Sequence, residues 1–275
     1  MKLCISKHLG LPPPDKHSCL IRQIRAFKDF KGLFQGFTLA EVLVTLGIIG
    51  VVAAMTMPSL IANHKEKETV ARLKKFYSSI SQSYLLAKEE YGTPDYWYTD
   101  EEVPYSQAAS NKMGDILTKN MKILKTCYGG KGCFPDITYK KIDGENATNW
   151  DNYKNIAKYL TNDGYSLFFF SYGNQFQNYG NGVLVKTYGA ISIDINGFKK
   201  PNIFGRDMFT FSFTEQGIVP NGAQIKIKNP FPYSCNRTKC TDAWCEGCAA
   251  WVIYNENMDY LHCDDLDWNG KTKCK

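Results

Sequence analysis

Residues 33–60 read LFQGFTLAEVLVTLGIIGVVAAMTMPSL, and this stretch decides how the chain is organised. From Val42 to Ile61 there are twenty consecutive residues without an ionisable side chain. A helix of that length spans about 30 Å, which is the thickness of the hydrocarbon core of a bilayer. A buried helix of a soluble protein is rarely apolar all round over such a length. The sequence therefore predicts one membrane-spanning helix.

The formal net charge of +6 is concentrated before this helix. Residues 1–36 hold seven Lys/Arg and two acids, a net charge of +5, which leaves +1 for residues 37–275. A nearly neutral body gives no support for nucleic-acid binding. By the positive-inside rule, the basic segment stays in the cytoplasm and the C-terminal body lies on the periplasmic or extracellular side. A secretory signal peptide is the alternative, but its apolar region would be shorter and would be followed by a small-residue cleavage site.

The segment Gly36-Phe37-Thr38-Leu39-Ala40-Glu41, followed by the apolar run, resembles the class III signal of type IV prepilins and type II secretion pseudopilins. The resemblance implies that a prepilin peptidase cuts between Gly36 and Phe37 and methylates the new N-terminal Phe37. It also implies assembly with other pilin or pseudopilin subunits, through an inner-membrane assembly platform, into a filament. The expected protein is structural and not an enzyme.

Glu41 is the one ionisable residue close to the start of the apolar run. An unpaired charge inside a membrane costs at least about 2.5 kcal/mol, so such residues are usually paired and functional. The resemblance supplies a partner, the α-amine of Phe37 on a neighbouring subunit, so Glu41 is expected to act in assembly. The alternative is that Glu41 lies among the lipid head groups and needs no partner.

The apolar helix contains residues that weaken it. Gly50 and Pro58 are expected to kink the helix, and Pro58 to bend or melt the turn before it. Thr38 and Thr45 are expected to donate their hydroxyls to preceding helical carbonyls.

Beyond Asn63, apolar residues recur at spacings of three and four, which predicts one helix over 37–91. Gly92 and Pro94 end it. Its first half is membrane or filament core, and its second half is expected to cover a sheet, although the same spacing is typical of a coiled-coil seam. The apolar positions are Val70, Leu73, Tyr77, Ile80, Tyr84, Ala87 and Tyr91.

Helices are also expected over 106–125 and 149–160, and strands over 165–172, 182–188, 190–195 and 208–214. Helices first and strands later predict an α+β, pilin-like fold with the long helix packed on an antiparallel sheet. The expected divisions are a removed leader (1–36), a transmembrane or filament-core helix (37–62), its amphipathic half (63–92), a globular domain (93–230) and a Cys-rich segment (231–275).

A second resemblance lies in Asp194-Ile195-Asn196-Gly197, Pro201-Asn202 and Gly205-Arg206-Asp207-Met208-Phe209, which are similar to the DxNG…PN…GxDxF stretch of many pseudopilin-like proteins. Asp194, Asn196 and Asp207 carry the oxygen atoms that Ca²⁺ prefers, which makes them candidate calcium ligands. The alternative is that Asn196-Gly197 marks a hairpin turn and Asp207 caps the connection. No other cofactor is expected.

Removal of the leader takes away Cys4 and Cys19 and leaves eight cysteines. Disulfides are expected in an exported domain, with Cys127 bonded to Cys133 across a Gly-rich turn. The six C-terminal cysteines allow 15 pairings. Zinc bound by the CxxC pair and two further cysteines, or a redox CxxC, are the alternatives. The six are Cys235, Cys240, Cys245, Cys248, Cys263 and Cys274.

Two functions remain open. The first is a structural subunit of a pseudopilus or a pilus-like filament, and the DxNG-like stretch favours the pseudopilus. The second is a membrane-tethered or tip-located minor pilin whose Cys- and Trp-rich C-terminal segment binds a ligand. Catalysis has little support, because His64 and His262 are the only histidines after the leader and no GxSxG, HExxH or P-loop occurs.

Overall fold

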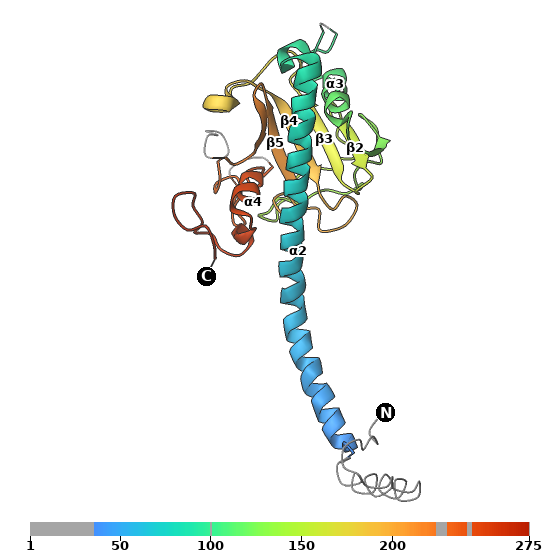
Figure 1. The fold of residues 1–275 in the computed structure, drawn as a ribbon, viewed down its shortest axis with the longest axis vertical. Coiled ribbons are helices and arrows are strands. Elements are labelled where there is room, and N and C mark those ends of the chain that lie inside the picture. Colours follow the sequence, from blue (N-terminus) through green and yellow to red (C-terminus); the bar gives the residue numbers. More distant parts are fainter. Residues whose placement is uncertain (1–35, 100, 224–229, 241–243, 275) are drawn as a thin grey trace, which may run out of the picture. The chain divides into compact units, whose positions relative to one another are not determined.

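The computed structural model describes residues 36–99, 101–223, 230–240 and 244–274. The basic leader of residues 1–35, with Cys4 and Cys19, lies outside the described residues. The chain divides into two compact units, one ending at Leu60 and one beginning at Ile61. The second unit contains a long helix, an antiparallel sheet and a disulfide-bonded C-terminal segment, as the sequence predicted (Figure 1).

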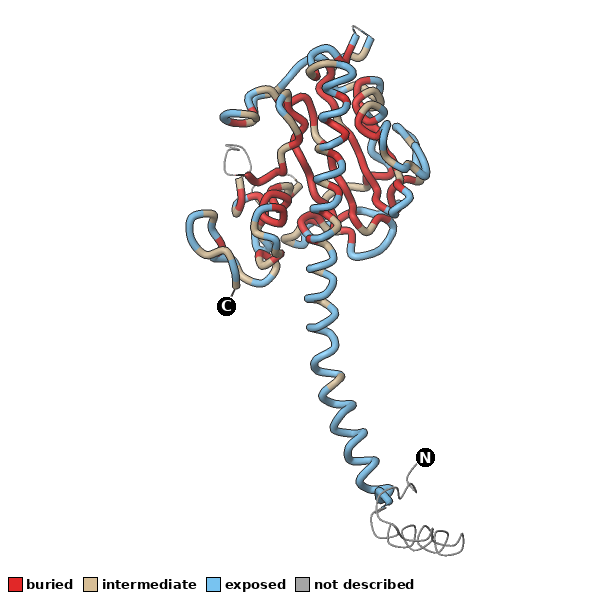
Figure 2. The backbone as a smooth tube through the Cα atoms, viewed as in Figure 1, coloured by how far each residue is buried: buried red, intermediate tan, exposed pale blue. Residues whose placement is uncertain are grey.

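Helix α2 (Leu39–Tyr91) begins two residues later than predicted. It is helical through Gly50 and Pro58, so the local melting expected before Pro58 is not present in this single chain. Up to Leu60 its large apolar side chains are exposed (Figure 2). An 18-residue window of the helix has a mean hydropathy of 2.2 and no buried residue, so its length and composition suffice to cross a membrane.

In the second unit α2 packs on the sheet through one face. Phe76 is buried although it is not one of the predicted apolar positions. The ring centroids of Phe76 and Tyr77 each lie 5.7 Å from the ring centroid of Phe211. Tyr91 lies at the exposed end of the helix. Gly92 follows with φ +80°, a left-handed conformation that suits glycine and stops the helix. The buried residues of α2 are Val70, Leu73, Phe76, Ile80, Ser83, Tyr84 and Ala87.

The sheet has six strands in sequence order, each antiparallel to the next. Two of them, β3 and β5, match predicted strands. The predicted strand 182–188 begins with a 3-10 turn, η3 (Gly182–Leu184). The next strand begins at Thr187 and ends at Asp194, one residue before the end of the predicted 190–195. The strands are β1 (Ile123–Thr126), β2 (Ala157–Thr161), β3 (Ser166–Ser171), β4 (Thr187–Asp194), β5 (Met208–Thr214) and β6 (Gly217–Pro220).

One predicted helix is shorter than expected and another is wrong. The helix expected over 106–125 ends at Thr118 as α3 (Gln107–Thr118), and the following residues form β1, where Leu124 is 66% exposed. The helix expected over 149–160 is absent, because its last residues pair with β3 as β2. Pairing with a neighbouring strand overrides local preference in both segments.

The two faces of the sheet carry different cores. The face under α2 and α3 is apolar and includes Leu167, Ile191, Ile193, Phe211 and Phe213. The other face mixes rings with polar side chains, including a hydrogen bond of 2.9 Å between Ser192 and Thr210. The segment between β1 and β2 covers this second face with Phe134, Tyr139 and Trp150.

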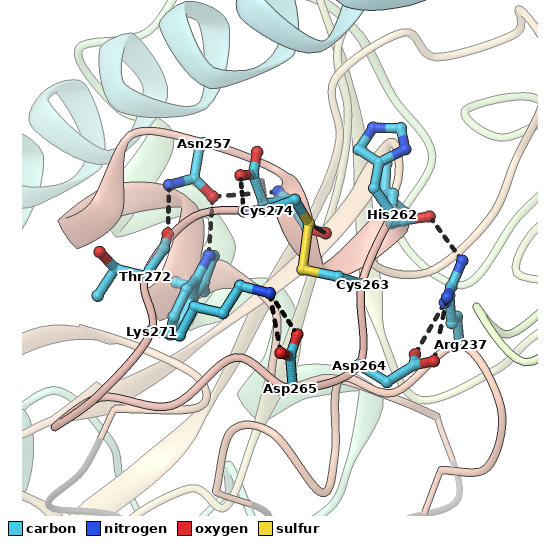
Figure 3. Close-up of a disulfide and its surroundings, with 12 residues drawn as sticks. Arg237, Asn257, His262, Cys263, Asp264, Asp265, Lys271, Thr272 and Cys274 are labelled. Carbon is cyan, nitrogen blue, oxygen red and sulfur yellow. Dashed lines mark hydrogen bonds and ion pairs between the residues drawn. A yellow bond between two sulfur atoms is a disulfide. The ribbon is translucent and has the colours of Figure 1, made fainter.

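The C-terminal segment packs beside β5 and β6 through α4 (Ala249–Asn255). Trp251 is fully buried and stacks on Phe231, with ring centroids 4.1 Å apart. The last loop closes through Cys263–Cys274 (Figure 3). Ion pairs of 2.8 Å flank that loop, and they join Arg237 to Asp264 and Lys271 to Asp265.

Candidate processing and assembly site

Gly36 and Phe37 lie before the first turn of α2. Among the described residues, a Cβ atom built on Gly36 meets no atom within 4 Å apart from those of its chain neighbours, and Phe37 is 86% exposed. The assignment of these residues to cleavage and methylation stays a prediction.

Thr38 and Glu41 form a reciprocal cap at the start of α2. The Thr38 hydroxyl accepts a hydrogen bond from the Glu41 backbone N–H at 3.2 Å. Glu41 Oε2 in turn accepts from the Thr38 N–H and from the Thr38 hydroxyl, both at 2.8 Å. This is the Thr-x-x-Glu capping box, which satisfies backbone donors that the first helical turn leaves without partners.

The expectation for Thr38 was therefore wrong. Thr38 precedes α2, and its hydroxyl donates forward to the Glu41 carboxylate. Thr45 behaves as expected and donates to the Val42 carbonyl at 3.0 Å. The Thr-x-x-Glu spacing itself was the signal that would have revealed the cap.

The cap uses only one of the two Glu41 carboxylate oxygens. Within the described part of the chain, Oε1 has no hydrogen-bond partner. No other acidic or basic side chain occurs from Phe37 to Ile61. The bonds to Oε2 therefore hold the carboxylate in place, and Oε1 can accept a hydrogen bond from a cationic group of another molecule.

All eight described cysteines form disulfides. The bonds are Cys127–Cys133, Cys235–Cys248, Cys240–Cys245 and Cys263–Cys274. The two cysteines of the CxxC pair thus bond to different partners, which leaves no CxxC disulfide of the redox type. The Asp143 carboxylate lies near the sulfurs of Cys240 and Cys245, but disulfide sulfur is not the thiolate that zinc requires.

The structure brings the candidate calcium ligands together at the end of β4. Asp194 is buried and accepts from the backbone N–H groups of Asn196 and Gly197, at 3.0 and 2.8 Å, and from the Tyr139 hydroxyl at 2.5 Å. Asn196-Gly197 does not form a two-residue hairpin, because β5 begins only at Met208.

Asp207 is the second buried carboxylate of this cluster. It accepts from the backbone N–H groups of Asn202 and Ile203, both at 2.6 Å, and from Asn196 Nδ2 at 2.9 Å. Burial raises the pKa of Asp207 to about 6. Burial and the neighbouring Asp207 charge raise the pKa of Asp194.

The hydrogen bonds of this cluster stabilise the connection between β4 and β5. Each carboxylate already accepts three hydrogen bonds from N–H or O–H groups. The side-chain oxygens of Asn196 and Asn202 are buried in this cluster without a hydrogen-bond partner among the described residues. Calcium binding by Asp194, Asn196 and Asp207 is untested and is the alternative to this hydrogen-bonded arrangement.

Comparisons with known proteins place the chain. Residues 33–57 match the prokaryotic N-terminal methylation motif, so the chain carries a type IV prepilin- or pseudopilin-type signal. Residues 59–256, more than half of the chain, match a family of unknown function, DUF6613. The chain belongs to DUF6613. In this DUF6613 protein the match extends from Ser59 in α2 through α4, and the Cys263–Cys274 loop lies beyond it. Neither the curated proteins nor the solved structures yield a match.

Proposed function

We propose that this DUF6613 protein is a structural subunit of a type II secretion pseudopilus or a type IV pilus-like filament. Prepilin peptidase cuts after Gly36 and methylates Phe37. The subunit then waits in the inner membrane with its globular unit outside the cytoplasm, and an assembly platform moves it into a filament of pilin-like subunits. The pilin-type signal supports a structural role, processing and assembly with other pilin subunits.

One observation carries the assembly role. Glu41 is capped by Thr38 through one oxygen, and its other oxygen has no hydrogen-bond partner among the described residues. Glu41 lies near the start of an apolar stretch of α2 that has an 18-residue window with no buried residue. In a filament, neighbouring apolar helices would bury the Glu41 carboxylate, and a buried carboxylate needs a cation beside it. The N-terminal amine of Phe37 on the neighbouring subunit keeps its positive charge after methylation and supplies one.

Substitution of Glu41 tests this role. Removing one partner of a buried ion pair costs about 3 to 5 kcal/mol, so Glu41→Gln and Glu41→Val should enter sheared filaments at least tenfold less than the wild type. Glu89→Gln makes the same chemical change at an exposed position of the same helix and should assemble normally. Cleavage after Gly36 should survive in all variants. Filaments that contain Glu41→Val at the wild-type level would refute the pairing.

Processing is tested by mass spectrometry of the protein from cells with active prepilin peptidase. The mature chain should begin at Phe37 and carry one extra methyl group. Gly36→Leu should leave the precursor uncut, because a large side chain fills the open space beside the scissile bond. An intact leader on the wild-type protein would overturn the proposed function.

A tip-located binding module is the other candidate, suggested by the Trp-rich C-terminal segment. Trp251 and Tyr260 are buried and Trp268 packs against Trp251, so these three residues belong to a core, while Tyr254 of the same segment is 57% exposed. Immunogold labelling distinguishes the two functions. Label along the shaft supports the filament subunit, and label only at tips supports the binding module.

A further inference from the structure

A groove of about 500 Å³ lies in the second unit, between α2 and the loop that joins β4 to β5. Helix α2 lines it from Ala62 to Arg72, and the loop lines it from Asn196 to Pro201. Ala62 follows directly on Ile61, the last residue of the apolar run. The groove therefore begins where the predicted membrane span ends.

The acidic side chains of the groove are already engaged. Glu66 lies 3.0 Å from His262, and Glu68 pairs with Arg72 at 2.8 Å. Asp207 accepts backbone N–H bonds, as described above. Arg72 is also occupied, because it donates to the carbonyl of Ile195 at 3.1 Å.

Three lysines of the groove have no such engagement. Lys65, Lys199 and Lys200 are exposed, and none of them forms an ion pair with any residue in the described ranges. Arg206 is also exposed, and its charge acts to lower the pKa of the neighbouring Asp207. Four cations around one concave site create a positive potential that favours an anion.

The position of Lys65 along the helix indicates the source of that anion. At 1.5 Å per residue, Lys65 lies about 6 Å beyond Ile61. The polar layer on each side of a bilayer is about 5 to 8 Å thick, so Lys65 reaches the level of the phosphates.

The loop adds an independent observation. Phe198 is 52% exposed and directly precedes Lys199 and Lys200. An exposed aromatic ring beside lysines is the combination by which interfacial segments bind anionic membranes.

We propose that this groove binds the phosphate of an anionic phospholipid head group in the leaflet next to the globular unit. The inference rests on the membrane-spanning stage of the proposed function. A bound lipid would fix the depth of the unassembled subunit in the membrane. The lipid would have to be released when the subunit enters a filament.

Native mass spectrometry of the full chain in neutral detergent tests the proposal, with phosphatidylglycerol and phosphatidylcholine of identical acyl chains as probes. The wild type should bind phosphatidylglycerol more tightly. Each lost cation lowers the affinity about fivefold, so Lys199→Gln/Lys200→Gln should weaken phosphatidylglycerol binding more than tenfold. Lys140→Gln/Lys154→Gln removes the same charge from exposed positions outside the groove and should change nothing.

Three results would overturn the proposal. If the wild type binds the two lipids equally, the groove does not select an anionic lipid, and an acidic protein surface becomes the expected partner of its cations. Equal loss in the two double variants would mean diffuse charge attraction. Displacement of phosphatidylglycerol by inorganic phosphate alone would mean a free-phosphate site. The same spectra report the N-terminal residue, so a chain that binds lipid selectively but keeps its leader would refute the filament role and not the groove.

Discussion

Lys158 is a charged residue that the fold buries completely, and its replacement by Met should destabilise the second unit. The residue lies in β2 on the mixed face of the sheet and is 0% exposed. Its ammonium group donates to the backbone carbonyls of Asp151 at 2.7 Å, Tyr153 at 3.1 Å and Trp150 at 3.4 Å. It thus ties the segment that covers this face to the sheet below.

The magnitude follows from those bonds. Lys158→Met keeps the approximate length of the side chain but leaves two well-bonded carbonyls without a donor, at about 1 to 3 kcal/mol each. Removal of a buried charge offsets part of this cost, since burial disfavours the charged form and lowers the pKa of Lys158. We expect a net loss of about 2 to 4 kcal/mol, which is about 5 to 12 °C in the unfolding midpoint of a unit of this size.

Thermal unfolding of the full chain in detergent, followed by near-ultraviolet circular dichroism, measures the effect. Trp150 stacks on Phe168 with ring centroids 4.4 Å apart, so this signal reports the same region. Lys154→Met is the matched control, because Lys154 is exposed in the same segment and should tolerate the change. If Lys158→Met melts within about 2 °C of that control, the ammonium does not hold the covering segment and the reasoning fails.

Three further outcomes are expected. Non-reducing mass analysis should find the mature chain eight hydrogens lighter than its reduced form, and Cys263→Ser/Cys274→Ser should cost about 3 kcal/mol by loop-closure entropy; eight free thiols would contradict the pairing. With calcium chelated, lowering the pH from about 7.5 to 5 should stabilise the wild type relative to Asp207→Asn by about 1.4 kcal/mol. Burial raises the pKa of Asp207 to about 6, so the folded wild type takes up this proton before the unfolded state does, and the variant has no such group. A pH-independent difference would contradict this. Calcium at about 1 mM should leave the midpoint unchanged, since hydrogen bonds occupy both carboxylates; a rise that Asp194→Asn abolishes would establish calcium ligation instead.

The features predictable from the sequence are those that depend on neighbours along the chain. The apolar run, the prepilin-type signal and the end of α2 at Gly92 are of this kind. So is β5, whose alternation is visible in its own residues. The Thr38–Glu41 cap is equally local, and the Thr-x-x-Glu pattern alone is enough to predict it.

The rest depends on residues far away in the sequence. Strand β2 is a strand because β3 lies beside it, and nothing within Ala157–Thr161 reveals that pairing. Lys158 looks like a solvated lysine until the segment before β2 folds over it. The groove at the end of the predicted membrane span likewise exists only because the loop after β4 returns to the middle of α2, between Ala62 and Arg72.

The nested order of two disulfides constrains how the chain matures. Cysteines that emerge from a translocation channel in sequence order and oxidise with their nearest predecessor would form Cys235–Cys240 and Cys245–Cys248. The native bonds instead enclose one loop within another, as Cys240–Cys245 lies inside Cys235–Cys248. Correct oxidation therefore requires either that folding gathers this segment before its thiols react, or that a disulfide isomerase reshuffles the first bonds. For this DUF6613 protein the order of folding and oxidation therefore decides whether the native pairs form directly or only after reshuffling.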